Sequence, residues 1–553
     1  MNNDNKITVY SYTVGKVKVD LRYYRGNGQY SDGDVEDEIL EALKNDTADK
    51  LLKTDTRWPV LYHLSPVRHH LLDGFNFKEG CSVLEIGCGC GAMSGILCQK
   101  AAAVEAVEIS PRRAQIAAYR NKEYDNLTIH VGNLNDIAFD KKFDYVTLIG
   151  VLEYAGSFTR TDNPYKNFLE NCRRFLKPDG TLIIAIENRL GMKYWSGAAE
   201  DHTGRRFDGI TGYKNIETVK TFSRKELKTL LQSVGLTKLQ WFYPYPDYKI
   251  PTDIFSDRFV PRVDDILEID NVSYDSDRIE LFSENDALIT MLDAGLYSEF
   301  ANSFLIFCQQ ENEGTVCVQP DYVHHSVYRV DDMRIGTTII ENNGKKIVRK
   351  FALNEASEKH IQNIVVNCQI LSDLYGKEHV AQSRLIKPGV LEMEYIEGKT
   401  FIECTMEAVE EIGVEGFAEY LDFYCKHILR GSEEAKEFPV KSINSNRRKY
   451  HFDLHLGNII IRNDSFVIID YEWLVEKLPI KFMLFRVLLH AFRKYGKPLT
   501  LHNIKFEKIA EIFEIGKEDM KRYLRWEENF YNLVLNQYRK NYEKKRLTIN
   551  FSK

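Results

Sequence analysis

The sequence has no hydrophobic run long enough to cross a membrane. Its start, MNNDNKITVY, contains no apolar segment of the kind that signal peptides carry, and the most apolar helical stretch, FMLFRVLLHAF at 482–492, is interrupted by Arg486. A membrane-spanning helix needs about 20 consecutive apolar residues. We therefore expect no transmembrane segment and a cytoplasmic protein.

The sequence also lacks a disulfide pattern and an excess of positive charge. Ten cysteines are scattered over 553 residues, and only Cys88 and Cys90 are close together. This spacing predicts neither a disulfide framework nor, without a second pair, a zinc site, and it favours a reducing compartment. A net charge of −7 argues against a broad nucleic-acid-binding surface, although it leaves room for a local basic groove.

Internal repeats and low-complexity segments are absent as well, and the composition is that of a folded protein. Hydrophobic residues make up 44% of the chain and charged residues 28%, which argues against extensive disorder. A chain of this length exceeds what one hydrophobic core holds, and two large domains fit it well.

In the first half of the chain, apolar strands alternate with helices. The expected strands are SVLEIG at 82–87, AVEAVEIS at 103–110, LTIHVGN at 127–133, FDYVTLIGVLEY at 143–154 and GTLIIAIEN at 180–188. Continuous apolar strands in this rhythm predict a parallel sheet that helices cover on both faces. We expect SFLIFCQ at 303–309 to close the sheet.

Three glycines follow the first of these strands. Gly87, Gly89 and Gly91 open a helix, so the backbone there can approach a ligand without a clash from Cβ. On its own this pattern is weak, and a tight turn beside a surface acid is the alternative. Glu108 strengthens the ligand interpretation, because a carboxylate at the end of the next strand can accept both hydroxyls of a ribose.

Five successive motifs of the first half resemble those of class I S-adenosylmethionine-dependent methyltransferases: VLEIGCGCG, EIS, VGN, FDYVTLIGVLEY and LKPDGTLIIAIEN. The resemblance covers residues 56–310 and implies a Rossmann-like α/β sheet with S-adenosylmethionine as cofactor. It also implies the cofactor-binding residues, which are Glu85, Gly87, Gly89 and Gly91 for the methionine part, Glu108 for the ribose, Asn133 and Leu134 for the adenine, Gly150 and Glu153 beside the methyl group, and Arg68 for the carboxylate. For Arg68, a solvated helix face is the alternative.

The methyl acceptor should lie beyond the fourth and fifth strands, because ligands bind at the carboxyl ends of parallel strands. The segment there, IENRLGMKYWSGAAEDHTGRRFDGITGY at 186–213, is dense in polar side chains. His202 is the best-placed candidate for a catalytic base, and Arg189, Arg205 and Arg206 are candidates for clamping an anionic acceptor. A structural or solvated role is the alternative for His202.

In the second half the pattern changes to a hairpin followed by a helix. DMRIGTTIIENNGKKIVRKFAL at 332–353 holds two strands around an Asn-Asn-Gly turn. Val348 and Lys350 share a face of the second strand, in the spacing of the kinase strand whose lysine pairs with nucleotide phosphates. Glu355 or Glu358, at the start of the following helix, is expected to orient Lys350.

The most specific pattern of the second half is HFDLHLGNIII at 451–461, followed by Asp470 at the end of the next strand. It resembles the aminoglycoside phosphotransferase and choline kinase branch of the protein-kinase-like fold, which implies a bilobal α+β domain that uses ATP and Mg²⁺. The implied roles are Asp453 as the catalytic residue at the attacking hydroxyl, Asn458 and Asp470 as magnesium ligands, and Lys350, Glu358, Met393 and Tyr395 around the nucleotide. No glycine-rich phosphate loop precedes Lys350, and an inactive descendant is the alternative.

A methyltransferase followed directly by such a kinase resembles the chain-terminating methyltransferase/kinases of bacterial O-antigen biosynthesis. The sequence predicts an accessory segment at 1–55 and a linker at 311–325, and the resemblances place a methyltransferase domain at 56–310 and a kinase-like domain at 326–553. The resemblance to the methyltransferase/kinases implies a bifunctional enzyme that phosphorylates a sugar hydroxyl and methylates the glycan or its phosphate in surface-polysaccharide biosynthesis. A lipid-linked glycan as acceptor would place the protein in peripheral contact with the inner face of the membrane. The long coiled coil of those proteins is not part of this sequence.

Two other functions remain open at this point. The missing glycine loop favours a methyltransferase whose kinase-like domain is catalytically weak and only binds nucleotide or sugar to position the acceptor. An RNA methyltransferase with an appended kinase fold is the third hypothesis. The acidic net charge and the lack of a recognisable RNA-binding module weigh against it, so we expect no nucleic acid partner.

Overall fold

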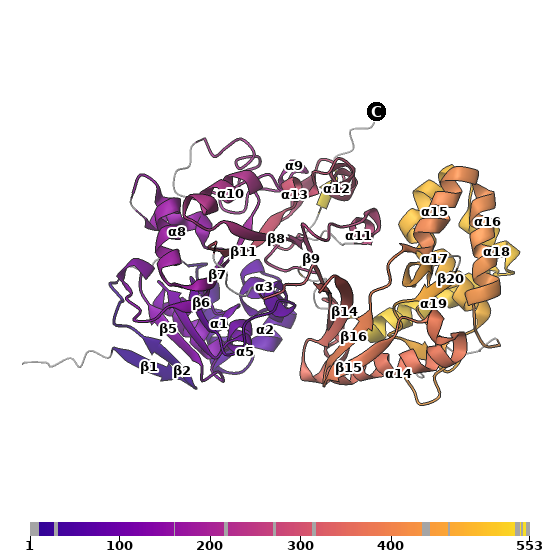
Figure 1. The fold of residues 1–553 in the computed structure, drawn as a ribbon, viewed down its shortest axis with the longest axis horizontal. Helices are drawn as coiled ribbons and strands as arrows, with labels where there is room; N and C mark the ends of the chain where they lie inside the picture. The colour runs from indigo at the N-terminus through magenta and orange to yellow at the C-terminus, as the bar shows by residue number, and fades with distance from the viewer. Residues whose placement is uncertain are drawn as a thin grey trace, which may run out of the picture. The chain divides into compact units, whose positions relative to one another are not determined.

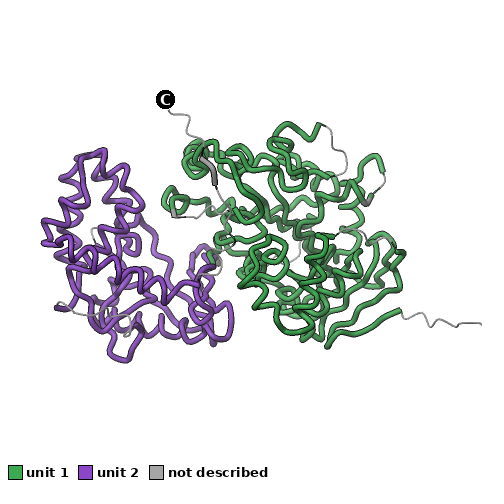
Figure 2. The backbone as a smooth tube through the Cα atoms, turned by 180° about the vertical axis from the view of Figure 1, so that it is seen from behind, with its two compact units in different colours: residues 1–325, 538–553 green, residues 326–537 purple. Residues whose placement is uncertain are grey.

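The chain divides into two compact units, which Figure 2 colours separately. The first contains residues 1–325 with 538–553, and the second contains residues 326–537. The computed structural model describes residues 10–26, 31–159, 161–214, 219–268, 273–311, 317–433, 443–462, 465–536, 542 and 546–548. Part of the predicted linker and most of the C-terminal tail lie outside these residues. In none of the described ranges is a helix both long and apolar enough to span a bilayer.

A parallel sheet forms the centre of the first unit (Figure 1). Its strands are β3 (Ser82–Ile86), β4 (Ala103–Glu108), β5 (Leu127–Val131), β6 (Phe143–Ile149) and β7 (Leu176–Glu187). They lie in the order β5-β4-β3-β6-β7, and every neighbouring pair is parallel. The Rossmann-like sheet predicted from the alternating pattern is confirmed.

Antiparallel strands extend this sheet beyond β7. The predicted closing strand, β11 (Ser303–Gln309), lies between β7 and β8 (Lys238–Tyr245) and runs antiparallel to both. β9 (Asp253–Ser256) pairs with β8, and β12 (Tyr322–His325) pairs with β9. The linker predicted at 311–325 is therefore too long, because its last four residues form a strand of the sheet.

The N-terminal segment joins the opposite edge of the same sheet. β1 (Ser11–Val14) and β2 (Val17–Asp20) form a hairpin, and β2 runs parallel to β5. The first unit also holds a small separate sheet, in which β10 (Arg278–Glu280) pairs in parallel with β22 (Arg546–Thr548).

Helices cover both faces of the sheet in the first unit. They are α1 (Val35–Lys44), α2 (Ala48–Thr54), α3 (Trp58–Leu64), α4 (His70–Asp73), α5 (Ser94–Lys100), α6 (Pro111–Arg120), α7 (Ala155–Phe158), α8 (Pro164–Arg174), α9 (Met192–Trp195), α10 (Arg224–Ser233), α11 (Val263–Glu268), α12 (Glu284–Asp293) and α13 (Tyr297–Phe300). Along β7, Ile183 joins the core beneath α5 and α6, whereas Ile184 joins the core beneath α8 and α10. Consecutive positions of β7 are apolar because both faces of the sheet are buried. Burial of each such isoleucine side chain contributes roughly 1.5–3 kcal/mol to the stability of the fold.

The second unit begins with a sheet in the order β13-β14-β16-β15. Its strands are β13 (Ile335–Asn342), β14 (Lys345–Ala352), β15 (Ser383–Lys387) and β16 (Val390–Glu394). The predicted hairpin is confirmed: β13 and β14 are joined by Asn343 and Gly344, whose φ angles of 52° and 74° are the positive values that a two-residue hairpin turn requires. The helix that follows is α14 (Glu358–Tyr375).

The rest of the second unit is mainly helical. It contains α15 (Phe401–Ile412), α16 (Val414–Phe423), α17 (Ile480–Leu501), α18 (Phe506–Ile512) and α19 (Lys517–Val534), with β17 (Lys399–Thr400), β18 (Tyr450–His451), β19 (Ile459–Arg462), β20 (Ser465–Ile468) and β21 (Leu474–Val475). The second domain was predicted to extend to residue 553, but the second unit ends at residue 537 and residues 538–553 belong to the first unit. There the hydroxyl of Tyr542 donates to the carbonyl oxygen of Leu52 at 2.7 Å.

Candidate functional site

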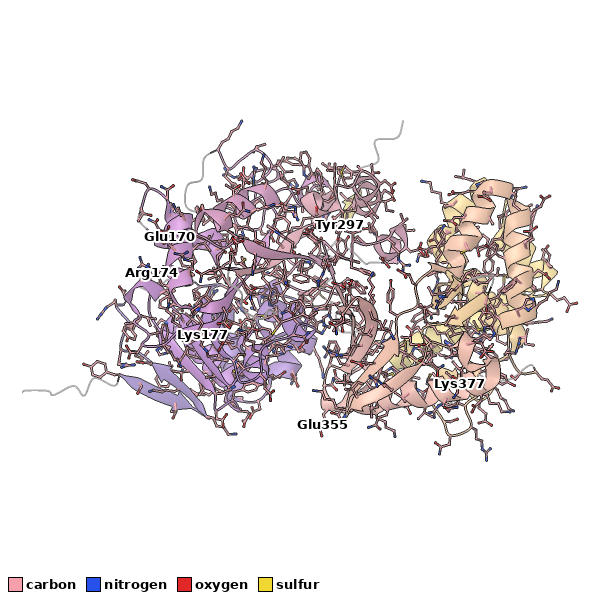
Figure 3. The ribbon with its side chains drawn as sticks, in the orientation of Figure 1. Glu170, Arg174, Lys177, Tyr297, Glu355 and Lys377 are labelled. Carbon is pink, nitrogen blue, oxygen red and sulfur yellow. The ribbon has the colours of Figure 1, made fainter. Side chains whose placement is uncertain are left out.

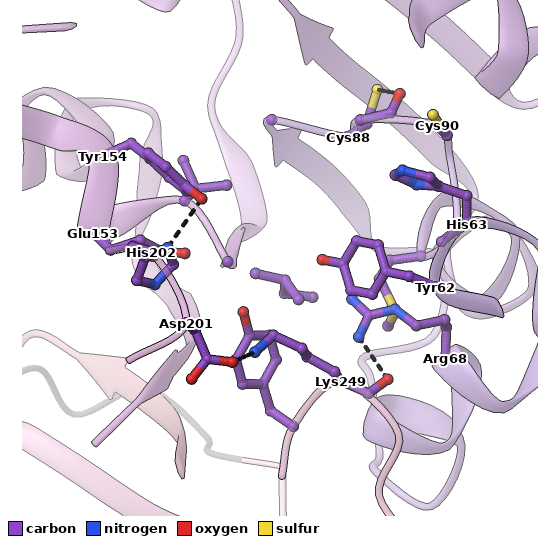
Figure 4. A pocket seen from close by; sticks show the side chains of 18 of the residues that line it. Tyr62, His63, Arg68, Cys88, Cys90, Glu153, Tyr154, Asp201, His202 and Lys249 are labelled. Atoms are coloured by element: carbon purple, nitrogen blue, oxygen red, sulfur yellow. Dashed lines mark hydrogen bonds and ion pairs between the residues drawn. The ribbon is translucent and has the colours of Figure 1, made fainter. Parts of the chain in front are cut away.

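A cavity of about 480 Å³ opens in the first unit at the carboxyl ends of the parallel strands. The residues that follow β3, β4, β5 and β6 line it together with the segments 58–68, 193–202 and 246–250. This is the edge at which sheets of this kind bind ligands, and the volume is that of a site for a small molecule. Figure 4 shows the side chains that face it.

The glycine turn after β3 forms part of the cavity wall. Gly87 and Gly89 line the cavity, both with positive φ; a Cβ on Gly87 would approach Val151 to 2.7 Å, whereas the space beside Gly89 is open. Gly91 is not among the lining residues, and a Cβ there would lie 2.8 Å from Ala117 in α6. Two of the three predicted glycines thus line the cavity, while Gly91 permits close packing of α6.

Two buried carboxylates lie beside this turn. Glu108, at the end of β4, accepts hydrogen bonds from the amides of Gly89 (2.8 Å) and Ser110 (2.9 Å), and burial raises its pKa. Glu85 accepts a hydrogen bond from the hydroxyl of Ser94 at 2.6 Å, and burial raises its pKa to about 7. Both side chains line the cavity, as the sequence predicts.

The remaining cofactor residues expected from the sequence also line this cavity. They are Asn133 and Leu134 after β5, Gly150 and Glu153 after β6, and Arg68. Together with Glu85 and Glu108, these residues come from positions up to 85 apart in the sequence, from Arg68 to Glu153 (153 − 68 = 85).

Arg68 is buried rather than solvated, with 2% of its surface exposed. Its guanidinium lies 4.4 Å from the centre of the Tyr62 ring, and Nη1 donates to the carbonyl oxygen of Lys249 at 2.6 Å (Figure 4). Nε of Arg68 has no hydrogen-bond partner within the described part of the chain. An unsatisfied cationic donor beside a cavity is suited to an anionic ligand group.

Three ionisable side chains converge at the opposite end of the cavity. Glu153 comes from the turn after β6, Glu187 from the end of β7, and His202 from the loop that follows. One ligand atom of each lies within 4.8 Å of the others. Glu153 and His202 line the cavity, whereas Glu187 lies behind them and is fully buried.

Hydrogen bonds and charge fix the state of His202. Its Nδ1 lies 3.1 Å from the hydroxyl of Tyr154 (Figure 4). Its Nε2 lies 3.6 Å from Oε2 of Glu187. Burial alone would lower the pKa of His202, but the nearby carboxylates, Glu187 above all, raise it to about 9. The role of His202 as a catalytic base stays a prediction.

A network of lysines and acids that carries no sequence motif borders this cluster. Nζ of Lys249 lies 2.5 Å from both Glu187 and Asp201, and Nζ of Lys193 lies 3.0 Å from Asp201. The polar run YPDYKI, directly after β8, was the only sequence signal for Lys249. These ammonium groups, and not the predicted arginines, supply positive charge on this side.

The three arginines predicted to clamp an acceptor are not among the residues that line the cavity. Arg189 pairs with Glu226 at 2.8 Å, and Arg205 pairs with Asp208 at 2.8 Å. Nε of Arg206 donates to the carbonyl oxygen of Gly197 at 3.1 Å. Each guanidinium already has a partner within its own loop or a neighbouring helix, so the prediction was wrong.

In the second unit, Lys350 lies on β14 and is buried. Its Nζ is 2.9 Å from Oδ1 of Asp470 and 3.0 Å from Oε1 of Glu472. The predicted partners lie elsewhere: Glu358 begins α14 and packs beside Gly389, and Glu355 is exposed (Figure 3). The acid that holds Lys350 therefore comes from the segment after β20 and not from the helix.

Asp453 and Asn458 lie in the loop between β18 and β19. Nδ2 of Asn458 donates to the carbonyl oxygen of Asp453 at 2.8 Å, and Nη2 of Arg486 lies 3.0 Å from Oδ1 of Asp453. Burial opposes ionisation of Asp453, but His455 and Arg486 hold its pKa well below the usual range. Asp453 is thus a carboxylate at neutral pH.

The two residues predicted near the adenine differ in environment. Met393 lies in β16 opposite Val348 and is buried. Tyr395 follows the strand and is half-buried, with Nζ of Lys346 5.4 Å from its ring centre.

The family model that matches this chain lies within the first unit. A family model described as "Methyltransferase domain" matches residues 84–184. The demethylmenaquinone methyltransferase of Tropheryma whipplei is 36% identical over 106 residues, which are 19% of this chain and 41% of that protein. The ubiquinone biosynthesis O-methyltransferase of Xanthomonas oryzae pv. oryzae is 28% identical over 151 residues, which are 26% of this chain and 60% of that protein. The chain thus spans about half the length of these relatives.

Solved structures give weaker likenesses. A Haemonchus contortus phosphoethanolamine N-methyltransferase, in complex with phosphoethanolamine and S-adenosylhomocysteine, is 13% identical with a TM-score of 0.29 and covers 51% of each chain. A Haloferax volcanii complex of the Trm112 methyltransferase activator and a methyltransferase is 17% identical with a TM-score of 0.28 and covers 50% of this chain and 98% of that one. The matched family model and the sheet order support a methyltransferase domain with a Rossmann-like sheet in the first unit.

Proposed function

We propose that the first unit transfers a methyl group from S-adenosylmethionine to an oxygen of a sugar-containing acceptor. The observation that carries this proposal is a single cavity that joins the glycine turn and Glu108 to the polar walls at 193–202 and 246–250. A cofactor and an acceptor would meet there at the ends of β6 and β7, where ligands of such sheets bind.

The residues around the turn suit the cofactor by their chemistry. Arg68 offers a buried donor to a carboxylate, Glu108 offers acceptor oxygens to ribose hydroxyls, and Gly89 leaves space where a side chain would stand. Asn133 and Leu134 offer a polar edge and an apolar face to adenine. These residues would hold S-adenosylmethionine along the strand ends.

The cofactor would supply a methyl group on a sulfonium, which is transferred by direct displacement. The protein must then align the acceptor and exclude water. Trp58, Tyr62 and Tyr248 line the cavity and provide ring faces against which a sugar packs. Glu153, which lines the cavity and is buried, would lie beside the acceptor hydroxyl.

A matched pair of variants on β4 tests the cofactor site. Glu108 faces the cavity, whereas Glu105 lies on the same strand and pairs with Lys141 at 2.7 Å. We expect Glu108→Gln to abolish S-adenosylhomocysteine binding and methyl transfer to a panel of saccharides, and Glu105→Gln to preserve both. Equal binding by the two variants would refute the assigned site.

We also propose that the second unit is an ATP- and magnesium-dependent phosphotransferase that acts on a sugar hydroxyl. The observation that favours this function is the 2.9 Å approach of Lys350 to Asp470, two residues that the kinase-like pattern assigns to one nucleotide site. Lys350 would pair with the phosphates, and Asp453, a carboxylate at neutral pH, would orient the attacking hydroxyl.

The donor set suits magnesium held by carboxylate and amide oxygens. The amide nitrogen of Asn458 is engaged by the backbone of Asp453, which leaves its Oδ1 as an acceptor, and the side chain of Asp470 is 39% exposed. We expect Asp453→Asn to bind ATP and to lose phosphate transfer. ATP binding without turnover by the unaltered protein, over the same saccharide panel, would instead favour a domain that only positions the acceptor.

A further inference from the structure

We propose that Glu153, Glu187 and His202 bind a divalent cation at the acceptor end of the cavity, with its open coordination positions directed at two neighbouring oxygens of the acceptor. The cation site itself stands on the geometry of these three side chains. The role toward the acceptor rests on the proposed methyl transfer.

The three side chains have the spacing of ligands that share one ion. Their ligand atoms lie within 4.8 Å of one another, and Nε2 of His202 is 3.6 Å from Oε2 of Glu187. That distance is too long for a hydrogen bond. Bonds of about 2.0–2.2 Å to a central ion place neighbouring ligand atoms roughly 3–4 Å apart, so little movement is needed.

The same atoms are buried and lack hydrogen bonds within the described part of the chain. Glu153 is 1% exposed and Glu187 is fully buried. Oε2 of Glu153, Oε2 of Glu187 and Nε2 of His202 make no hydrogen bond to any of the residues that the structure describes. Buried polar atoms are rarely left unsatisfied, and three that face one another indicate a shared occupant.

Neighbouring groups orient the three ligands toward one point. Tyr154 engages Nδ1 of His202 at 3.1 Å, which leaves Nε2 for an ion, and Lys249 engages Oε1 of Glu187 at 2.5 Å, which leaves Oε2. Such outer contacts commonly fix metal-binding histidines and carboxylates. The charge of Lys249 is itself offset by Asp201, also at 2.5 Å.

The donor set indicates the kind of ion and of acceptor. One imidazole and two carboxylates suit Mn²⁺, Zn²⁺ or Fe²⁺ better than Ca²⁺, which prefers oxygen ligands alone. Because Glu153 and His202 line the cavity, the ion would be reached from it. Adjacent oxygens, as in a sugar 1,2-diol, would complete the coordination and hold one hydroxyl near the methyl group.

The test is Mn²⁺ binding by the full-length protein after treatment with a chelator. An Asp470→Ala background removes the magnesium site proposed in the second unit, so that electron paramagnetic resonance counts only the new site. We expect one bound Mn²⁺ in this background. Adding Glu153→Gln or His202→Ala should weaken it about tenfold or more, while S-adenosylhomocysteine binding reports that the cavity is intact.

Asp247→Asn serves as the matched control, because Asp247 lines the same cavity but lies outside the cluster. It should keep the Mn²⁺ affinity of the parent. Failure of the Asp470→Ala protein to bind Mn²⁺, or equal affinity in the Glu153→Gln and His202→Ala variants, would overturn the proposed site. Mn²⁺ binding without methyl transfer to any saccharide would leave the site standing and contradict the proposed function.

Discussion

Nζ of Lys350 lies 3.0 Å from Oε1 of Glu472, a residue 122 positions later in the chain. Glu472 also pairs with Arg329 at 2.5 Å and with His360 at 2.9 Å, and it is buried. One carboxylate thus compensates a lysine and an arginine in the interior of the second unit.

Replacing Glu472 should destabilise the second unit strongly. Glu472→Gln leaves the buried Lys350 with Asp470 alone and the partly buried Arg329 without its carboxylate partner, which costs up to about 3–5 kcal/mol. Denaturant unfolding of the variant measures this loss. Glu358→Gln, at the position that the sequence suggested, should change stability by less than about 0.5 kcal/mol; similar losses in both variants would contradict this assignment.

Arg68 should matter for the cofactor and Arg189 should not. Removing a charge-assisted hydrogen bond costs about 1.5–3 kcal/mol, so Arg68→Ala should weaken S-adenosylhomocysteine binding by roughly 10- to 100-fold. Calorimetric titration measures the change. Arg189→Ala removes only the pair with Glu226 outside the cavity, so this variant should bind S-adenosylhomocysteine as tightly as the unaltered protein. An equal loss of affinity in both variants would contradict the direct contact of Arg68 with the cofactor.

Gly91 and Gly80 form a matched pair that separates packing from backbone strain. Both have positive φ, but a Cβ on Gly91 meets Ala117 at 2.8 Å, whereas the space beside Gly80 is open. Gly80→Ala should cost about 1–2 kcal/mol from strain alone. Gly91→Ala should lower the free energy of unfolding by about 1–3 kcal/mol more than Gly80→Ala does, because α6 must move to make room for the methyl group. Thermal unfolding of both variants checks the difference, and equal midpoints would argue against close packing at Gly91.

Glu85 should make the first unit less stable as pH rises. Its pKa is about 7 in the folded chain against a usual 4.5, so the folded state binds the proton more tightly. The stabilisation is complete below pH 4.5 and is lost as pH rises to about 7, a change of up to about 3 kcal/mol. Glu85→Gln should remove this dependence, so its midpoint should rise relative to the unaltered protein between pH 5 and 8. A difference in midpoint between the two proteins that does not change with pH would contradict the raised pKa of Glu85.

The sequence by itself determined the elements whose signals are local. The strand, glycine turn and helix around Gly87, the acid at Glu108 and the hairpin at Asn343 and Gly344 each depend on residues close together in the chain. Periodicity and turn chemistry fix such elements before any tertiary contact forms. The central sheet and one wall of the cavity therefore followed from the pattern.

Only the tertiary structure decided which charges meet. Arg189, Arg205 and Arg206 looked available but have partners, whereas Lys193 and Lys249, which carried no motif, border the acceptor end. A side chain's partner depends on how distant segments pack, and an isolated lysine or arginine carries no periodic signal. The pKa of His202 has the same origin, since Glu153 and Glu187 reach it only when β6, β7 and the loop at 188–214 fold together.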